Sequence, residues 1–191
     1  EFHPGQFLMF EFKINNNIEK RAFSISSSPN EKLIEITVKK TKDPFVSEYI
    51  VDNVKKGDQF TISEARGKFI LNTVTKEILF LAAGSGIAPI MSMIRFLNKN
   101  KLRIKHHLTY SNKTEEEILW KNDIESISKN NKYFSHEFIL TQNNQRINEI
   151  NLKQFIENKE TNFYICGPLG FVRDLYSFLI KNQISKNNIK I

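Results

Sequence analysis

A glycine-containing turn with the sequence AAGSGIAPI occupies residues 82–90. Its two glycines allow a tight turn and a close approach of ligand phosphates, and the amides that open a helix at Ile87 would point at that charge. The usual dinucleotide fingerprint has a third glycine where this chain has Pro89, which a first helical turn tolerates because no hydrogen bond is lost there. The next predicted strand ends at Ser111 and Asn112, without the acidic residue that ordinarily binds a ribose. Alone, the turn predicts either a pyrophosphate loop or a purely structural turn.

Two further motifs flank this turn in the chain: RAFSISS at 21–27 and YICGP at 164–168. An arginine offers a planar, permanently charged fork that suits phosphate oxygens. An aromatic ring can lie against a flat ligand, and a serine hydroxyl can donate a hydrogen bond. Each residue also has a simpler interpretation when taken alone: Arg21 as a solvated strand charge, Phe23 as a core aromatic and Cys166 as a small buried hydrophobe.

The first part of the chain has the pattern of short strands. β-Branched and aromatic residues in near-alternation with polar ones predict antiparallel strands at residues 7–14, 20–26, 32–40 and 58–63. Between the last two, VSEYIVDNV at 46–54 predicts a short helix capped by Ser47.

Beyond a seam near residues 72–76, strands alternate with helices. The predicted strands are 77–84, 104–111, 134–141, 162–167 and 187–191, and the predicted helices are 87–100, 114–127, 152–159 and 171–182. The glutamates at 115–117, after Thr114, suit the first turn of a helix. Apolar strands joined by crossover helices predict a doubly wound, five-stranded parallel sheet. The sequence therefore predicts two domains, residues 1–73 and residues 74–191.

Together and in this order, the motifs R-x-F-S-x-x-S, G-S-G-I-A-P and C-G-P resemble the ferredoxin–NADP reductase superfamily. The segment at 110–125 is also similar to NADH-using flavoprotein reductases of that superfamily. The resemblance implies an α+β then α/β fold, in which an antiparallel flavin-binding β-barrel precedes a nicotinamide-nucleotide domain. Barrels of this family have six strands, so two N-terminal strands are expected to be missing from this sequence. The implied cofactors are FAD and either NADH or NADPH.

The resemblance assigns the flavin to the first motif. Arg21 would bind the phosphates, Phe23 would lie against the isoalloxazine ring, and Ser24 would act catalytically by donating its hydroxyl to flavin N5. Further flavin contacts are implied at Ile36, Val38 and Lys39, and at Val46 and Ser47 in the turn before the short helix. Relatives usually have a glycine where this chain has Pro44, so the expected phosphate contact at that turn is weakened.

The nicotinamide nucleotide is assigned to the other two motifs. Its expected ligands are Gly84, Ser85, Gly86, Ile87, Pro89, Asn112, Lys113, Gly167 and Pro168. Cys166 would lie near nicotinamide C4 as a catalytic positioning residue, since hydride transfer between two cofactors needs no protein nucleophile. Lys113 could meet the 2′-phosphate of NADPH, but a single lysine without an arginine cluster favours NADH.

Composition excludes several other classes. The formal net charge of +7 comes from lysines scattered singly and in pairs, which predicts a solvated surface and no nucleic-acid partner. The longest apolar run, residues 78–83, is far short of the roughly 18–20 residues of a membrane span. With Cys166 as the only cysteine there is no intrachain disulfide, cysteine zinc site or four-cysteine cluster, and a reducing cytoplasm is expected. His106 and His107 are adjacent on a strand and point to opposite faces, so no metal site is expected.

The sequence thus predicts a flavin-dependent oxidoreductase that takes hydride from NAD(P)H to FAD and passes electrons to a protein or small-molecule acceptor. The acceptor is unidentified, and an acidic redox protein would suit the positive charge. The chain is expected to be a monomer. One alternative is an electron-transfer subunit of a larger redox complex. The other is a flavin-free binding module on the same fold, suggested by the charge of +7 and by Pro44.

Overall fold

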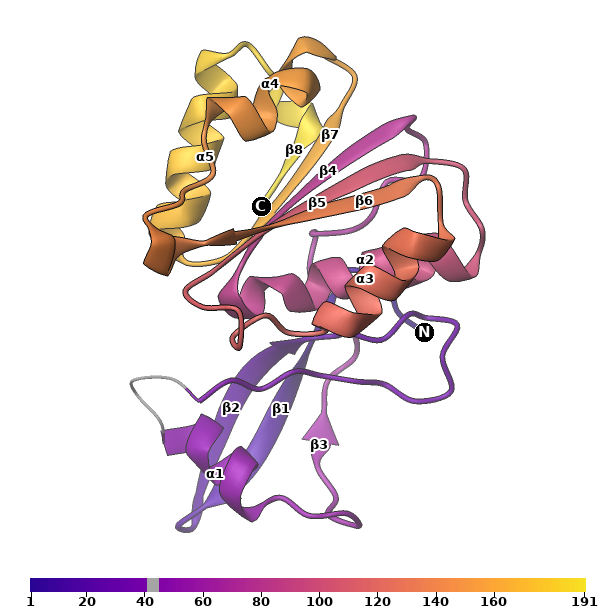
Figure 1. Cartoon of the computed structure of the whole chain (residues 1–191). Coiled ribbons are helices and arrows are strands. Elements are labelled where there is room, and N and C mark those ends of the chain that lie inside the picture. The colour runs from indigo at the N-terminus through magenta and orange to yellow at the C-terminus, as the bar shows by residue number, and fades with distance from the viewer. Residues whose placement is uncertain (41–44) are drawn as a thin grey trace.

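The computed structural model of the chain describes residues 1–40 and 45–191 and contains two sheets (Figure 1). The antiparallel sheet has the order β2-β1-β3, with β1 at Phe7–Ile14, β2 at Asn17–Ser24 and β3 at Thr61–Ile62. The parallel sheet has the order β6-β5-β4-β7-β8, with β4 at Glu77–Ala83, β5 at Lys105–Asn112, β6 at Phe134–Leu140, β7 at Asn162–Cys166 and β8 at Ile189–Lys190. An antiparallel part followed by a doubly wound, five-stranded parallel sheet confirms the predicted fold class.

The hairpin β1–β2 is the main element of the first part. It turns through Asn15 and Asn16, whose φ values of 48° and 64° suit a two-residue hairpin loop. Alternation along β1 places Phe12 and Ile14 on one face, where both are buried with Val46 of α1 (Phe45–Asn53). This small cluster closes one side of the antiparallel sheet.

The segment 32–40, predicted as a strand, is not one. Among the described residues, Ile36 alone forms a β-bridge, to Ile25, and Leu33 and Ile34 are exposed. The amide of Glu35 donates to the hydroxyl of Ser27 instead of a strand carbonyl. The alternating pattern was misleading because a strand also needs a backbone partner along its length. In the segment predicted as a strand at 58–63, only the two residues of β3, Thr61 and Ile62, form a strand.

Three predicted helix starts are wrong. The helix predicted from residue 152 begins at Glu149, because Asn148 caps it in a capping box with Asn151. Helix α1 begins at Phe45, so Ser47 lies inside its first turn and is not its N-cap. Helix α3 begins at Lys121 rather than Thr114, because Trp120 has a left-handed φ of 53° that no continuous helix tolerates. The segment before it forms turns that carry the buried Ile118 and the partly buried Leu119 onto the core.

Helices cover both faces of the parallel sheet. Helices α2 (Ile87–Lys99) and α3 (Lys121–Asn130) pack on one face, and α4 (Glu149–Glu157) and α5 (Leu169–Lys181) on the other. Short 3-10 turns at Gly84–Gly86, Thr141–Asn143 and Lys186–Asn188 complete the elements. In Figure 1, α2 and α3 lie between the parallel sheet and the antiparallel one. They therefore form the layer through which the two parts meet.

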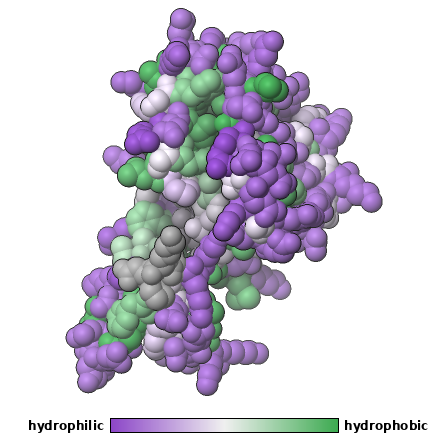
Figure 2. All heavy atoms as spheres, turned by 60° about the vertical axis from the view of Figure 1, so that its left-hand side comes forward, coloured by the Kyte–Doolittle hydropathy of each residue, from purple (hydrophilic) through white to green (hydrophobic). Residues whose placement is uncertain are grey.

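Hydrophilic residues cover most of the face shown in Figure 2, with smaller hydrophobic patches between them. Within residues 1–40 and 45–191, no helix is long and apolar enough to cross a membrane.

Candidate functional site

Three loops meet at the carboxyl edge of the parallel sheet, where ligands of open α/β folds bind. They follow β4, β5 and β7, and the register pairs Ala82 with Cys166 and Ala83 with Ser111. A Cβ on Gly86 would stand 2.3 Å from the carbonyl oxygen of Cys166, and one on Gly167 would stand 2.9 Å from the Cβ of Ala83. The second and third sequence motifs are thus in direct contact.

The glycine turn is open on one side. Gly84 has a left-handed φ of +54°, and among the described residues no atom outside the turn itself lies within 4 Å of a Cβ placed on it. The hydroxyl of Tyr110 donates to the Gly84 carbonyl at 2.9 Å, and burial raises the pKa of that hydroxyl to about 12, so it stays a donor. Gly86 precedes α2 and has no side chain to cap it. The Ile87 amide donates back to the carbonyls of Gly84 and Ser85, so the 3-10 turn runs directly into the helix. Pro89 lies within the first turn of α2, as expected.

Asn112, at the end of β5, is a buried side chain that interacts with the Tyr110 hydroxyl but makes no hydrogen bond of normal geometry among the described residues. It is 4% exposed, and within the described residues neither its Nδ2 nor its Oδ1 makes a hydrogen bond. A buried carboxamide normally satisfies both groups. A ligand with donors and acceptors at this edge, such as a nicotinamide nucleotide, would fit that need. The adjacent Lys113 is exposed and its carbonyl accepts from the amide of Gln142.

Cys166 lies at the end of β7 with a partly buried side chain. Burial raises the pKa of its thiol to about 11. The thiol is therefore protonated at neutral pH, which suits a neutral group that packs against a ligand rather than a nucleophile.

The flavin motif lies on β2. Arg21 and Phe23 share a face of the strand and Ser24 points to the other. The guanidinium of Arg21 is half exposed, and its Nη1 donates to the Lys20 carbonyl at 2.8 Å and lies 3.4 Å from Glu19 Oε2. The exposed guanidinium of Arg21 could bind a flavin phosphate, and the half-buried ring of Phe23 on the same face could pack against the flavin ring.

Phe23 meets Phe10 and Phe12 edge to face, at centroid distances of 5.8 and 6.2 Å. Val46 is 3% exposed in the same cluster, so only its backbone is available to a cofactor. The prediction based on Pro44 lies outside the described residues.

The other predicted flavin contacts are dispersed. Ile36 forms the single bridge to Ile25, and Val38 follows it in the same irregular segment. The ammonium of Lys39 forms a 2.8 Å ion pair with Glu117, so this side chain joins the two parts of the molecule. Ser47 lies in the first turn of α1.

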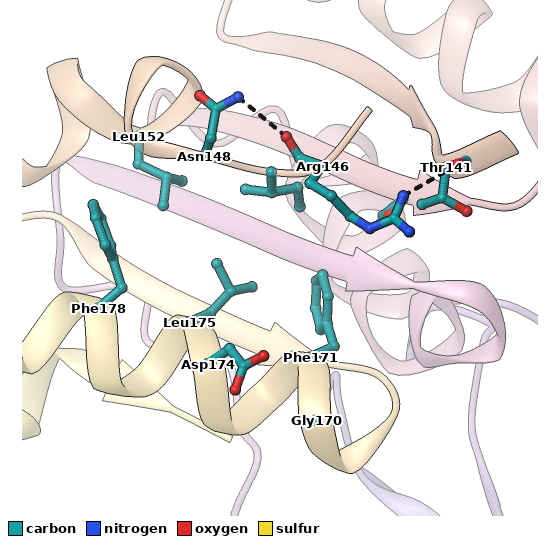
Figure 3. Close-up of a pocket in the computed structure, with 11 residues that line it drawn as sticks. Thr141, Arg146, Asn148, Leu152, Gly170, Phe171, Asp174, Leu175 and Phe178 are labelled. Carbon is teal, nitrogen blue, oxygen red and sulfur yellow. Dashed lines mark hydrogen bonds between the residues drawn. The ribbon is translucent and has the colours of Figure 1, made fainter. Parts of the chain in front are cut away.

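A cavity of about 750 Å³ lies beside the same sheet edge, on the face covered by α4 and α5 (Figure 3). Its lining residues are Ser111, Thr141, Arg146, Ile147, Asn148, Leu152, Gly170, Phe171, Asp174, Leu175 and Phe178. Figure 3 shows apolar side chains of α5 facing Leu152 of α4, with the guanidinium of Arg146 directed towards Thr141. That guanidinium donates to the carbonyls of Thr141 and Gln145, at 3.1 and 2.8 Å.

The sequence motifs did not indicate Thr141, Arg146 or Asp174. For Thr141 and Arg146, which follow β6, position was the available signal, because residues that follow a parallel strand collect at its carboxyl edge. Asp174 lies inside α5 and gave no such signal. The histidines form no comparable site: His106 is buried and His107 bonds Ser135 at 2.7 Å. In the described part of the chain, no group of three or more His, Cys, Asp or Glu side chains could hold a metal ion.

Comparison with known proteins gives two family models in tandem. Residues 1–70 match the oxidoreductase FAD-binding domain and residues 80–176 match the oxidoreductase NAD-binding domain. The glycine betaine monooxygenase reductase subunit of Pseudomonas aeruginosa is 26% identical over 186 residues, covering 90% of this chain and 50% of that protein. Flavohemoprotein A of Dictyostelium discoideum is 27% identical over 202 residues, covering 97% and 51%. The chain thus spans about half the length of these curated relatives.

Among solved structures, the flavohem-like FAD/NAD-binding domain of nitric oxide dioxygenase from Vibrio cholerae superimposes with a TM-score of 0.89 at 22% identity. The match covers 99% of this chain and 84% of that one. At this identity the likeness establishes the fold.

Proposed function

This chain belongs to the ferredoxin–NADP reductase superfamily, and on that basis we propose that it is an NAD(P)H-dependent, FAD-containing reductase that passes electrons to a further acceptor. The observation that carries the proposal is the contact between Gly86 and Cys166 at the carboxyl edge of the parallel sheet. It joins two nucleotide motifs into one site, while the flavin motif lies on the antiparallel sheet across α2.

The nicotinamide nucleotide, when bound, supplies the hydride and FAD supplies the ring atom that receives it. On the flavin side, Arg21 would hold phosphate, Phe23 would support the ring, and the Ser24 hydroxyl would donate to N5. Backbone groups of Ile36, Val38, Lys39, Val46 and Ser47 would bind the rest of FAD.

On the nucleotide side, the turn formed by Gly84, Ser85 and Gly86, with Ile87 and Pro89, would bind pyrophosphate. Asn112, Lys113, Gly167 and Pro168 would line the path to the nicotinamide. Cys166 would place its neutral thiol against the reacting end and exclude water there.

The cavity beside α4 and α5 would take the adenosine half of the nucleotide. Its apolar walls suit a base, and it lies at the sheet edge that already holds the glycine turn. The carboxylate of Asp174 lines it and forms an exposed ion pair with Arg173 at 3.1 Å, while the guanidinium of Arg146 is engaged with two carbonyls. We therefore propose that NADH is preferred, because a 2′-phosphate would face that carboxylate.

The division between the domains is proposed to lie between residues 73 and 74. Tyr164 of β7 ties the end of the first domain to the second, since its hydroxyl accepts from the Asn72 amide at 2.7 Å and donates to the Ile70 carbonyl at 3.3 Å. Val74 is 91% exposed directly after this contact.

A second candidate is an electron-transfer subunit of a larger redox complex. The similarity to a reductase subunit favours it. For either role, the net charge of +7 favours an acidic protein as electron acceptor. We further propose that the chain is a monomer and that it acts in the cytoplasm.

The experiment measures the rate of NADH oxidation by the FAD-loaded protein with ferricyanide as electron acceptor. The control is the same protein without FAD. NADH oxidation that requires FAD supports the proposal. So does a Ser24→Ala variant in which the turnover rate falls by a larger factor than the affinity for FAD. A colourless protein that binds no FAD and oxidises no NADH would instead indicate a flavin-free binding module.

A further inference from the structure

Helix α2 contacts both cofactor motifs. Its amino end carries the glycine turn, and its middle binds the carbonyls of Ser26 and Ser27, in the segment that directly continues β2. The Ser92 hydroxyl donates a 2.6 Å hydrogen bond to the Ser27 carbonyl, with both residues fully buried. One rigid element therefore reaches from the nucleotide turn to the flavin strand.

Arg95 is the polar centre of this contact. Its Nη1 donates to the Ser26 carbonyl at 3.0 Å and lies 2.7 Å from Glu35 Oε1, and its Nη2 lies 3.5 Å from Asp123 Oδ2. The guanidinium carbon is 5.4 Å from the centre of the Trp120 ring. The side chain is only 16% exposed, so these interactions are partly desolvated.

Glu35 completes the arrangement from the other side. The same Oε1 accepts from the hydroxyl of Ser26 at 2.8 Å, and the Glu35 carbonyl accepts from the Ser26 amide at 2.8 Å. Ser26 is thus fixed between Glu35 and Arg95. Only one residue, Ile25, separates Ser26 from Ser24, the proposed donor to the flavin.

The helix sets the spacing between the two ends. From Ile87 to Arg95 is eight residues, about 12 Å of helix at 1.5 Å per residue. Hydride transfer needs donor and acceptor within about 3–3.5 Å, so a small change in this spacing would slow it.

We propose that Arg95 is a positioning residue for hydride transfer: through Ser26 and Glu35 it fixes the flavin strand relative to the nucleotide turn carried by its own helix. This inference rests on the proposed reductase function. It assigns Arg95 no contact with either cofactor.

The test compares Arg95→Ala, Arg95→Lys and the unmodified protein, with Arg103→Ala as control, since Arg103 is an exposed arginine beyond the end of α2. Three quantities are measured: FAD affinity, the rate of flavin reduction at saturating NADH, and the emission of Trp120, the only tryptophan. Ser92→Ala is a milder second variant, because it removes only the hydrogen bond to Ser27.

We expect Arg95→Ala to slow reduction by about 10–100-fold while FAD affinity changes by less than about threefold, and to shift Trp120 emission. Arg95→Lys keeps the charge but not the planar fork, so it should recover only part of the rate. Ser92→Ala should slow reduction in the same direction, and Arg103→Ala should match the unmodified protein.

Reduction at the unmodified rate in Arg95→Ala, or a loss that saturating FAD fully restores, would overturn the positioning role. An unmodified protein that binds FAD but is not reduced by NADH or NADPH would overturn the proposed function itself. In that case Trp120 emission would still report whether Arg95 holds the contact.

Discussion

Gly86 and Cys166 are packed so closely that the smallest side chain on Gly86 would stand 2.3 Å from the Cys166 carbonyl oxygen and 2.6 Å from the Gly167 amide nitrogen. Backbone atoms cannot give way as a flexible side chain can. The contact locks the glycine turn to the loop after β7.

Gly86→Ala should therefore lower the free energy of unfolding by about 1–3 kcal/mol, the usual cost of overpacking. Gly170→Ala is the matched control, because the residue is inside α5 and, in the part of the chain that the structure describes, nothing beyond the helix's own backbone lies within 4 Å of a Cβ there. It should be neutral or stabilise by up to about 1 kcal/mol. Urea unfolding measures both, and equal stability of the two variants would contradict the packing.

The Cys166 thiol should react slowly with iodoacetamide. Burial raises its pKa from an ordinary 9.0 to about 11, so at pH 8 the thiolate is about 100-fold scarcer in the folded chain than in urea. The folded rate should climb tenfold per pH unit up to about pH 11, and the unfolded rate should level off near pH 9. With only one cysteine, mass spectrometry gives the rate directly. Equal rates in folded and unfolded protein at pH 8 would exclude the buried thiol.

Arg21→Ala should weaken FAD binding by about 1.5–3 kcal/mol, the value of a charge-assisted hydrogen bond to phosphate. Lys20→Ala is the control on the opposite face of the same strand, where the lysine pairs with Glu11. Fluorescence titration with FAD measures both. Equal losses of FAD affinity in the two variants would show that Arg21 contributes only positive charge and makes no specific contact with a phosphate.

Asp174→Asn should raise kcat/KM for NADPH relative to NADH by several-fold, because it removes the carboxylate that would face a 2′-phosphate. The ratio is its own control, since stability changes affect both coenzymes alike. An unchanged ratio would place the adenosine half outside this cavity.

Much of the fold could be predicted from hydrophobic patterning. The parallel strands and α2 and α5 have buried, periodic sequences, and their observed bounds lie within two residues of the predicted ones. The failures were places where tertiary contacts override local pattern. The segment 32–40 alternates like a strand but has one bridge, and α3 starts late because Trp120 is left-handed.

The candidate site likewise has a part that the sequence could predict and a part that it could not. The glycine turn and Cys166–Pro168 could be found because their motifs are contiguous and specific. Arg95 and Asp174 could not, because nothing local distinguishes them from other charged residues on helices. Arg95 contacts Ser26 and Glu35, which lie in a distant segment. Asp174 shares its cavity with residues at the ends of β5 and β6.

The central claim is direct hydride transfer from a reduced nicotinamide nucleotide to FAD on this chain. The most direct measurement is anaerobic mixing of FAD-loaded protein with NADH, followed by the loss of flavin absorbance, with the transferred hydrogen as protium or deuterium. The account predicts complete reduction that is measurably slower with deuterium. The account would be contradicted if neither NADH nor NADPH reduced the flavin. It would also be contradicted if protium and deuterium gave equal rates under conditions in which hydride transfer is the rate-limiting step.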